Sequence, residues 1–215
     1  MSLFITGTDT GVGKTFLSVQ LLRLLRERGL RCAALKPICC GDRHDAELLL
    51  AASNEGLTID EINPLWLRTP VAPFAASLVE RVEIDPKRLI DGFEEINRRF
   101  DFVMVEGVGG WMVPITKNYF VGDLAAAMDL PVLVLAQNRL GCLNHTLLTL
   151  QSIDAKGTRA AGIVLNPLAN GADIATATNA DVLTKIIDLP LLPMLTEDST
   201  ELSVDWCCAL TLDPG

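Results

Sequence analysis

The sequence predicts an α/β fold with a doubly wound, mainly parallel sheet and helices on both of its faces. Short apolar runs alternate along the chain with longer helical stretches, and this order is typical of parallel strands joined by right-handed crossovers. The short runs are apolar almost throughout, as strands are when both faces of the sheet are covered. We expect residues 1–215 to form a single domain, because this length suits one α/β domain.

The expected strands are residues 3–6, 32–36, 102–106, 132–137, 162–166 and 191–195. Helices are expected between them, at residues 14–28, 86–99, 121–128, 143–155 and 173–187. Prolines interrupt the pattern within residues 37–81, where we expect a short helix near residues 45–52 and then loops.

The first helix has the clearest periodic pattern. Its apolar residues are predicted to form one stripe of Phe16, Leu17, Leu21, Leu24 and Leu25. Gly29 is predicted to end this helix, because glycine adopts the left-handed conformation of a helix C-terminus without strain.

Composition argues against several classes of function. The net charge is −9, and an acidic chain is a poor ligand for nucleic acid or for an anionic membrane. No apolar run approaches the length of a membrane span, and the N-terminus lacks the basic start and apolar stretch of a signal peptide. The six cysteines contain no CxxC spacing, and with two histidines a zinc site is not expected. We expect a cytoplasmic protein with reduced thiols that binds neither nucleic acid nor membrane.

A glycine-rich segment follows the first expected strand. It reads Gly-Thr-Asp-Thr-Gly-Val-Gly-Lys-Thr at residues 7–15 and opens the first helix. In a P-loop, a strand, a glycine-rich turn and a helix follow in this order, and backbone N–H groups with the helix N-terminus bind phosphate oxygens. Lys14 can reach the β- and γ-phosphates of ATP, and the Thr15 hydroxyl can bind Mg²⁺. The common spacing GxxxxGK[ST] requires a glycine at the position of Thr8, but the glycine is Gly7. The alternative is a glycine-rich turn without a ligand.

Charged residues stand near the ends of further strands. Glu106 follows a buried run, so it is expected at the carboxyl edge of the sheet, where such folds bind ligands. It either holds Mg²⁺ or is a surface acid that begins a loop. Asp45 lies in a charged stretch, where the residues alone favour the N-cap of a short helix. Lys36 is either a solvated strand end or a group that meets a transferred phosphoryl group.

Several further short motifs follow one another along about residues 3–166. Besides residues 7–15, they are Lys36-Pro37 with Gly41, Asp45-Ala46, residues 106–110, Val113-Pro114, residues 140–145 and residues 162–166. Together they closely resemble the corresponding segments of the dethiobiotin synthetase family. The combination is specific, whereas the phosphate loop alone indicates the wider group of P-loop NTPases.

The resemblance implies a P-loop NTPase fold and an enzyme of biotin biosynthesis. Such an enzyme closes the ureido ring of dethiobiotin from 7,8-diaminononanoate and CO2, and it releases ADP and phosphate from ATP. An amine of the substrate is carbamoylated, ATP phosphorylates the carbamate, and the second amine attacks the mixed anhydride. The implied cofactor is Mg²⁺, with ATP as co-substrate. The implied partners are these small molecules and a second copy of the chain, in a homodimer whose active site lies at the subunit interface.

The resemblance also implies roles for individual residues. The implied Mg²⁺ ligands are Thr15, Asp45 and Glu106, and the implied catalytic contacts to phosphates and carbamate are Thr10, Lys14 and Lys36. The nucleotide is expected to bind Thr10, Gly11, Val12, Gly13, Lys14, Thr15, Phe16 and Asn166, with Asn166 at the adenine. The substrate is expected to bind Lys36, Cys40, Gly141, Cys142, Leu143 and Asn144, with residues 141–144 as a helix start for the carboxylate of the partner's substrate. For His145 we expect a packed or capping role.

The sequence departs from the family pattern in places. Cys40 stands where the family usually has serine, residues 191–196 lack an expected Leu-Gly-x-x-Pro, and the stretch from Trp206 onward has no counterpart. Two other functions compete. An amidotransferase-linked synthetase usually carries a glutamine-hydrolysing domain, for which 215 residues leave no room. A partner-regulated ATPase switch of the chromosome- or septum-positioning type usually carries a second lysine where this chain has Thr8 and Asp9, and the chain also lacks a basic amphipathic C-terminal helix.

Overall fold

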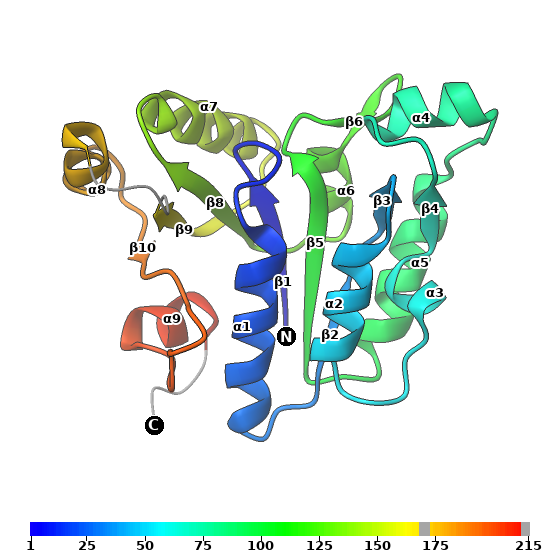
Figure 1. The fold of residues 1–215 in the computed structure, drawn as a ribbon, viewed down its shortest axis with the longest axis horizontal. Coiled ribbons are helices and arrows are strands. Elements are labelled where there is room, and N and C mark those ends of the chain that lie inside the picture. Colours follow the sequence, from blue (N-terminus) through cyan, green and yellow to red (C-terminus); the bar gives the residue numbers. More distant parts are fainter. Residues whose placement is uncertain (168–172, 212–215) are drawn as a thin grey trace.

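The computed structural model describes residues 1–167 and 173–211. Its centre is a six-stranded sheet in which neighbouring strands are parallel, in the order β10-β9-β8-β1-β5-β2 (Figure 1). The strands are β1 (Ser2–Gly7), β2 (Cys32–Leu35), β5 (Phe102–Gly110), β8 (Val132–Asn138), β9 (Ala160–Pro167) and β10 (Leu191–Leu192). From β1 the chain goes to β2 at one edge, returns to β5 beside β1, and then continues through β8, β9 and β10 to the other edge. Strands are thus added on both sides of β1, which confirms the predicted doubly wound parallel sheet.

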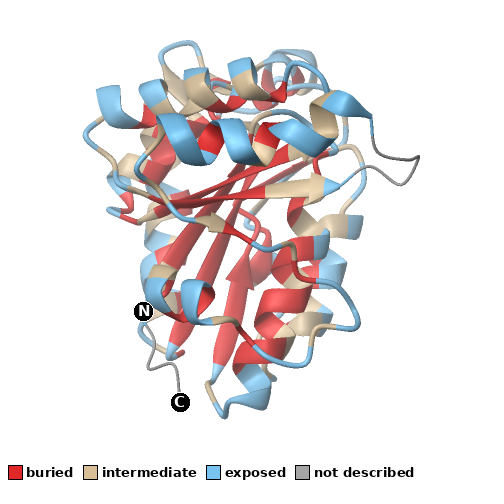
Figure 2. Cartoon of the chain, turned by 90° about the vertical axis from the view of Figure 1, so that its left-hand side faces the viewer, coloured by how far each residue is buried: buried red, intermediate tan, exposed pale blue. Residues whose placement is uncertain are grey.

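Helices cover both faces of this sheet. They are α1 (Lys14–Glu27), α2 (His44–Ala52), α5 (Pro86–Asn97), α6 (Val121–Ala127), α7 (Cys142–Ala155), α8 (Ile174–Ile186) and α9 (Val204–Ala209). One hydrophobic cluster packs α1, α2 and α9 on one face, and another packs α5, α6 and α7 on the other. Within β1, Leu3 and Ile5 join the first cluster and Phe4 the second, as the alternation of side chains along a strand requires. Figure 2 shows the buried strands between helices whose outer faces are exposed.

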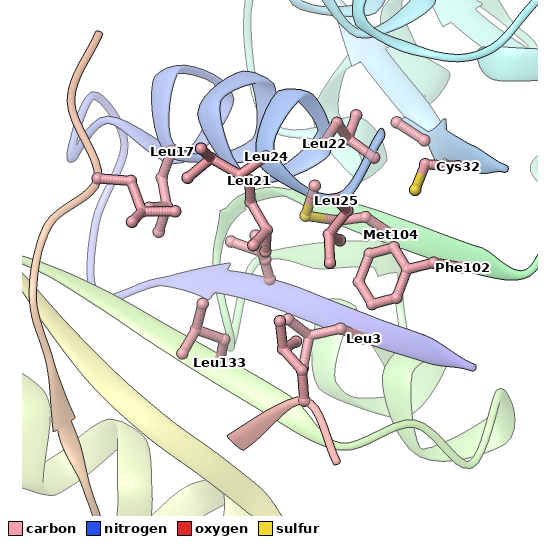
Figure 3. Close-up of a cluster of buried hydrophobic side chains, with 14 of the residues drawn as sticks. Leu3, Leu17, Leu21, Leu22, Leu24, Leu25, Cys32, Phe102, Met104 and Leu133 are labelled. Carbon is pink, nitrogen blue, oxygen red and sulfur yellow. The ribbon is translucent and has the colours of Figure 1, made fainter. Parts of the chain in front are cut away.

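The first helix packs on the sheet largely as its sequence pattern predicts. Figure 3 shows Leu17, Leu21 and Leu25 of α1 facing the strands of the sheet, and these residues are fully buried. Phe16 does not belong to this stripe, because it is 42% exposed. Consecutive residues of a helix point about 100° apart, and this rotation turns Phe16 to the side of Leu17 that faces away from Leu21 and Leu25. The helix ends at Glu27, and Gly29 follows with a φ of 86°, which confirms the predicted stop.

Regions rich in proline differ most from the expectation. The predicted strand at residues 191–195 ends at Leu192, because Pro193 has no N–H for a further ladder hydrogen bond. Residues 53–81, expected as loops, contain α3 (Ile59–Ile62), β4 (Leu65–Leu67) and α4 (Pro73–Glu80). Proline begins α4 at a position where its missing N–H costs nothing. Strand β4 pairs in parallel with β3 (Ile38–Cys40), and β6 (Pro114–Thr116) pairs with β7 (Tyr119–Phe120).

The carboxyl ends of β1 and β5 lie side by side at the centre of the sheet. The register pairs Ile5 with Glu106 and Gly7 with Gly110. The glycine-rich loop after β1 and the acid on β5 therefore meet at one edge. Among the residues that the structure describes, no helix is both long and apolar enough to span a membrane.

Candidate active site

The phosphate loop connects the end of β1 to the start of α1, and two of its glycines occupy crowded positions. A Cβ atom on Gly7 would lie 2.6 Å from the carbonyl oxygen of Asp9 and 2.8 Å from Cγ2 of Val12. The chain thus folds back over residue 7, which explains why the first glycine of the loop stands there. Gly13 is the N-cap of α1 with a φ of 98°, a conformation that glycine adopts without strain.

Lys14 is buried beneath the loop. Its Nζ donates a hydrogen bond of 2.8 Å to the carbonyl oxygen of Gly109, at the end of β5. Burial lowers the pKa of Lys14 to about 8, and the neighbouring ammonium of Lys36 acts in the same direction. Both cations would be stabilised by a ligand that carries several negative charges.

Glu106 is fully buried and binds three side chains. Its Oε1 accepts hydrogen bonds from Thr15 Oγ1 at 2.8 Å and from Lys36 Nζ at 2.5 Å, and its Oε2 accepts one from Ser18 Oγ at 2.9 Å. A buried carboxylate requires such partners, because burying an unpaired charge is costly. Glu106 is therefore not a surface acid that begins a loop.

Asp45 lies in the first turn of α2 but does not cap this helix. The N-cap residue is Arg43, and Asp42 Oδ1 accepts the backbone hydrogen bond from His44 at 3.0 Å. Asp45 Oδ2 instead accepts a hydrogen bond of 2.9 Å from Lys36 Nζ. Burial alone would raise the pKa of Asp45, but the charge and hydrogen bond of Lys36 outweigh it and lower this pKa. The N-cap interpretation of Asp45 is wrong.

Lys36 lies between the two acids. Burial would lower its pKa, but the carboxylates of Glu106 and Asp45 outweigh burial and raise this pKa above its usual range. It is therefore a buried ammonium ion and not a solvated strand end.

The oxygens around this ammonium suit a hard cation. They belong to the carboxylates of Asp45 and Glu106, and the Thr15 hydroxyl contacts Glu106 directly. Within residues 1–167 and 173–211, no group of three or more His, Cys, Asp and Glu side chains could hold a metal ion. Mg²⁺ commonly needs only one or two carboxylates, because water and substrate phosphates complete its shell. Thr15, Asp45 and Glu106 fit such a shared site.

These residues border a cleft of about 620 Å³ at the carboxyl edge of the sheet. Its lining includes predicted residues from the loop, the strand ends and β3: Thr10, Gly11, Gly13, Lys14, Thr15, Phe16, Lys36, Cys40, Asp45 and Glu106. Burial raises the pKa of the Cys40 thiol to about 11, so this thiol is neutral at neutral pH. All six thiols of the chain are free.

Asn166 approaches the same loop from β9. Its Nδ2 donates a hydrogen bond of 2.9 Å to the carbonyl oxygen of Val12, and a Cβ atom on Gly13 would lie 2.5 Å from that Nδ2. The Val12 side chain is buried in the core, so Val12 contributes its backbone to the loop. An amide group has two N–H donors and an acceptor oxygen, so Asn166 can hold the loop and contact another group together.

Residues 141–144 do not line the cleft of their own chain. Gly141 is the exposed N-cap of α7, with a φ of 91°, and Asn144 is also exposed. A second cavity of about 370 Å³ lies between the phosphate loop and α7, and Thr10 borders both cavities. The structure therefore does not bring residues 141–144 to Lys36 and Cys40 within one chain. His145 is exposed, so a packed role for this residue is wrong.

Sequence reasoning missed groups that hold the site together. Ser18, which binds Glu106, lies one helical turn after Lys14 on the buried face of α1. A serine on this leucine-rich face was the available signal, because a buried hydroxyl needs a partner. Nothing in the sequence indicated that the carbonyl oxygen of Gly109 would accept a hydrogen bond from Lys14.

Comparison with known proteins agrees with this geometry. A family described as an AAA domain matches residues 1–199. An ATP-dependent dethiobiotin synthetase of Akkermansia muciniphila is 40% identical over 204 residues, which cover 95% of this chain and 96% of that protein. An ATP-dependent dethiobiotin synthetase of Aromatoleum aromaticum is 41% identical over 197 residues, which cover 88% of this chain and 87% of that protein.

A solved structure resembles the chain in fold. It is the septum site-determining protein MinD of Pyrococcus horikoshii, complexed with Mg-ADP. The TM-score is 0.57 at 15% sequence identity, and the match covers 99% of this chain and 96% of the other. This likeness confirms the P-loop NTPase-like fold, and it carries no argument for a septum-positioning function.

Proposed function

The chain belongs to the ATP-dependent dethiobiotin synthetase family, and from this premise we propose that its cleft closes the ureido ring of dethiobiotin. The substrates are 7,8-diaminononanoate, CO2 and ATP, and the other products are ADP and phosphate. One observation carries the proposal: the buried ammonium of Lys36 lies between the carboxylates of Asp45 and Glu106, beside the phosphate loop. Such a centre can bind phosphates and a carbamate together.

In this proposal the chain acts mainly by positioning and by charge. Backbone N–H groups of the phosphate loop and the N-terminus of α1 bind the triphosphate. Lys14 and Lys36 offset the negative charge that develops as the γ-phosphoryl group passes to the carbamate oxygen. Thr15, Asp45 and Glu106 are the side chains that would hold Mg²⁺, which supplies further neutralisation of phosphate charge when bound. Asn166 reads the adenine edge.

The reaction can be tested directly. The purified chain is incubated with ATP, magnesium, 7,8-diaminononanoate and ¹³C-labelled bicarbonate, and the products are analysed by mass spectrometry. We expect dethiobiotin that carries the label in its ureido carbonyl, with ADP formed in equal amount. ATP hydrolysis without dethiobiotin would instead favour an ATPase switch.

We infer further that the active form is a homodimer. Support comes from the exposed helix start at residues 141–144 and from exposed apolar side chains next to this helix start or around the second cavity. Met112, Leu140 and Leu148 are 52%, 82% and 56% exposed, and Met112 and Leu148 line that cavity. Apolar groups gathered around a cavity favour a protein contact. The start of α7 would then bind the carboxylate of the substrate held by the partner subunit.

We also propose a single domain and a cytoplasmic location for the chain. Residues 1–215 are proposed to act as one domain, which is supported by two hydrophobic clusters that share a single sheet. A cytoplasmic location is supported by six free thiols, because thiols oxidise in compartments outside the reducing cytosol.

Replacement of Asp45 by asparagine is expected to raise the magnesium concentration needed for half-maximal activity roughly tenfold, because an amide is a weaker ligand for a hard cation. The side chain is 48% exposed, so the fold should persist. Calorimetric titration of ADP at graded magnesium concentrations measures the same effect without catalysis. Asp91→Asn, at an exposed acid that pairs with Lys87 on α5, is the matched control. A magnesium dependence like that of the wild type would leave Asp45 as a partner of Lys36 only.

Replacement of Cys40 by serine is expected to keep or improve activity, because a hydroxyl is a stronger hydrogen-bonding group than a thiol. A thiol-blocking reagent should inhibit the wild type, and the diamine should protect it. Because the pKa of Cys40 is raised to about 11, the thiolate fraction and the labelling rate should rise about tenfold per pH unit from neutral pH towards that value. Peptide mapping separates Cys40 from the exposed Cys208. Complete labelling of Cys40 with full activity would place it outside the substrate site.

A further inference from the structure

Trp66, on β4, has no role in the site described so far. It is 37% exposed, whereas Trp111 and Trp206 are buried. Its indole Nε1 donates a hydrogen bond of 2.8 Å to the carbonyl oxygen of Gly41. This bond joins β4 to the turn that follows Cys40, on the side of the cleft where we propose that the diamine binds.

Gly41 is held at both of its peptide groups. Its N–H donates a hydrogen bond of 2.9 Å to the carbonyl oxygen of Leu67, and its carbonyl accepts from Trp66. Its φ is 88°, and a Cβ atom there would lie 3.0 Å from Cβ of Pro70. The turn at residues 40–42 is therefore fixed by β4 and the residues that follow it.

The indole ring of Trp66 is fixed in turn by two arginines. The guanidinium carbons of Arg43 and Arg68 lie 5.1 Å and 4.5 Å from the ring centroid. At these distances each guanidinium attracts the electron-rich face of the ring. These contacts lie outside the cleft, and they add to the hydrogen bond by which the indole N–H holds Gly41.

Arg43 connects this stack to the buried centre of the site. Its guanidinium donates hydrogen bonds of 2.9 Å to Asn63 Oδ1 and 2.8 Å to the carbonyl oxygen of Asn63. Asn63 is buried, and its Nδ2 donates a hydrogen bond of 2.8 Å to the carbonyl oxygen of Lys36. The contacts of Trp66 thus extend to the backbone on both sides of Cys40.

We propose that Trp66 is a positioning residue for the diamine side of the cleft. It fixes the turn at residues 40–42, and through this turn the Cys40 side chain before it. The inference rests on the proposed function, because that function assigns Cys40 to the substrate. It predicts that loss of the indole N–H weakens use of the diamine more than use of ATP, whose loop lies on β1 and α1.

The test distinguishes the contribution of the indole N–H from the contribution of the aromatic ring. Trp66→Phe keeps an aromatic ring for the arginines, and incorporation of β-(3-benzothienyl)alanine at position 66 keeps the bicyclic shape, while both lack the N–H donor. Each is expected to raise the KM for the diamine about threefold to tenfold, the range for one lost hydrogen bond, and to change the KM for ATP less than twofold. Arg68→Met is the matched control, because it removes a stacking partner and leaves the N–H in place.

Fluorescence provides a readout that does not depend on turnover. Acrylamide should quench an exposed emission component in the wild type that Trp66→Phe lacks, because the other tryptophans are buried. Saturating diamine should reduce this quenching in the wild type. An unchanged diamine KM in both variants that lack the N–H, or an equal rise in the KM for both substrates, would overturn the proposal. A wild-type chain that forms no dethiobiotin would instead contradict the proposed function on which the inference rests.

Discussion

Replacement of Lys14 by alanine is expected to reduce turnover at least about a hundredfold, the usual cost of removing a group that stabilises transition-state charge. Lys14 is buried and bound to the carbonyl oxygen of Gly109, so its ammonium cannot be replaced by a neighbour without movement. Lys36 is held in its own position by Asp45 and Glu106, so its ammonium cannot move into the place of the Lys14 ammonium. The loss should therefore appear in kcat as well as in the affinity for ATP.

Two measurements distinguish this loss from unfolding. The melting temperature of Lys14→Ala should stay near that of the wild type, because the hydrophobic clusters and the contacts of Glu106 remain. Thr15→Val is the companion variant, and it should mainly weaken the magnesium-dependent part of nucleotide binding. Near-normal ATP turnover in Lys14→Ala would remove the basis for assigning residues 7–15 as the phosphate loop.

The central sheet could be predicted because its strands are buried on both faces. Continuous apolar runs such as residues 102–105 have few alternatives in a folded chain. The same reasoning failed for β3 and β4, whose short strands pair with each other away from the main sheet. Short runs between prolines carry little periodic signal, so their pairing depends on the tertiary structure around them.

The candidate site was predictable where a residue type and its position in the fold both point to chemistry. Lys14 and Thr15 follow a glycine loop between a strand and a helix, and the structure places them in the cleft. Asp45 was ambiguous because an acid near a helix start can cap the helix or face a ligand. Its contact with Lys36, nine residues away, decides against the cap. The sequence did not indicate a role for Trp66, because its hydrogen bond to the turn at Gly41 forms only in the folded chain.

Substitution at the start of α7 is expected to reveal whether two subunits share the active site. Gly141 is exposed, and a Cβ atom there would meet no other atom within 4 Å. Gly141→Trp therefore has room within its own chain, although its φ of 91° makes any side chain somewhat strained. We expect it to raise the KM for the diamine strongly and to leave ATP binding nearly unchanged, because the bulk would obstruct the helix start that we propose faces the partner's substrate.

Gly157→Trp is the matched control for this variant. Gly157 follows the other end of α7, is exposed and has a positive φ of 68°, and a Cβ atom there would also meet no other atom within 4 Å. Backbone strain and added bulk are thus similar, while the distance to the proposed interface differs. A diamine KM near the wild-type value in Gly157→Trp would assign the effect at Gly141 to its location.

Complementation then tests the shared site itself. The Lys14→Ala and Gly141→Trp chains are mixed under conditions of subunit exchange, at a diamine concentration so low that neither chain alone is active. If each site combines the phosphate loop of one chain with the α7 start of its partner, as we propose, one site of the heterodimer carries both defects and the other carries neither. Random exchange makes about half of the dimers heterodimers, so activity should return to about a quarter of the wild-type value per chain. If exchange is proven by mass and no activity returns, or if the wild type sediments as a fully active monomer, each active site belongs to a single chain.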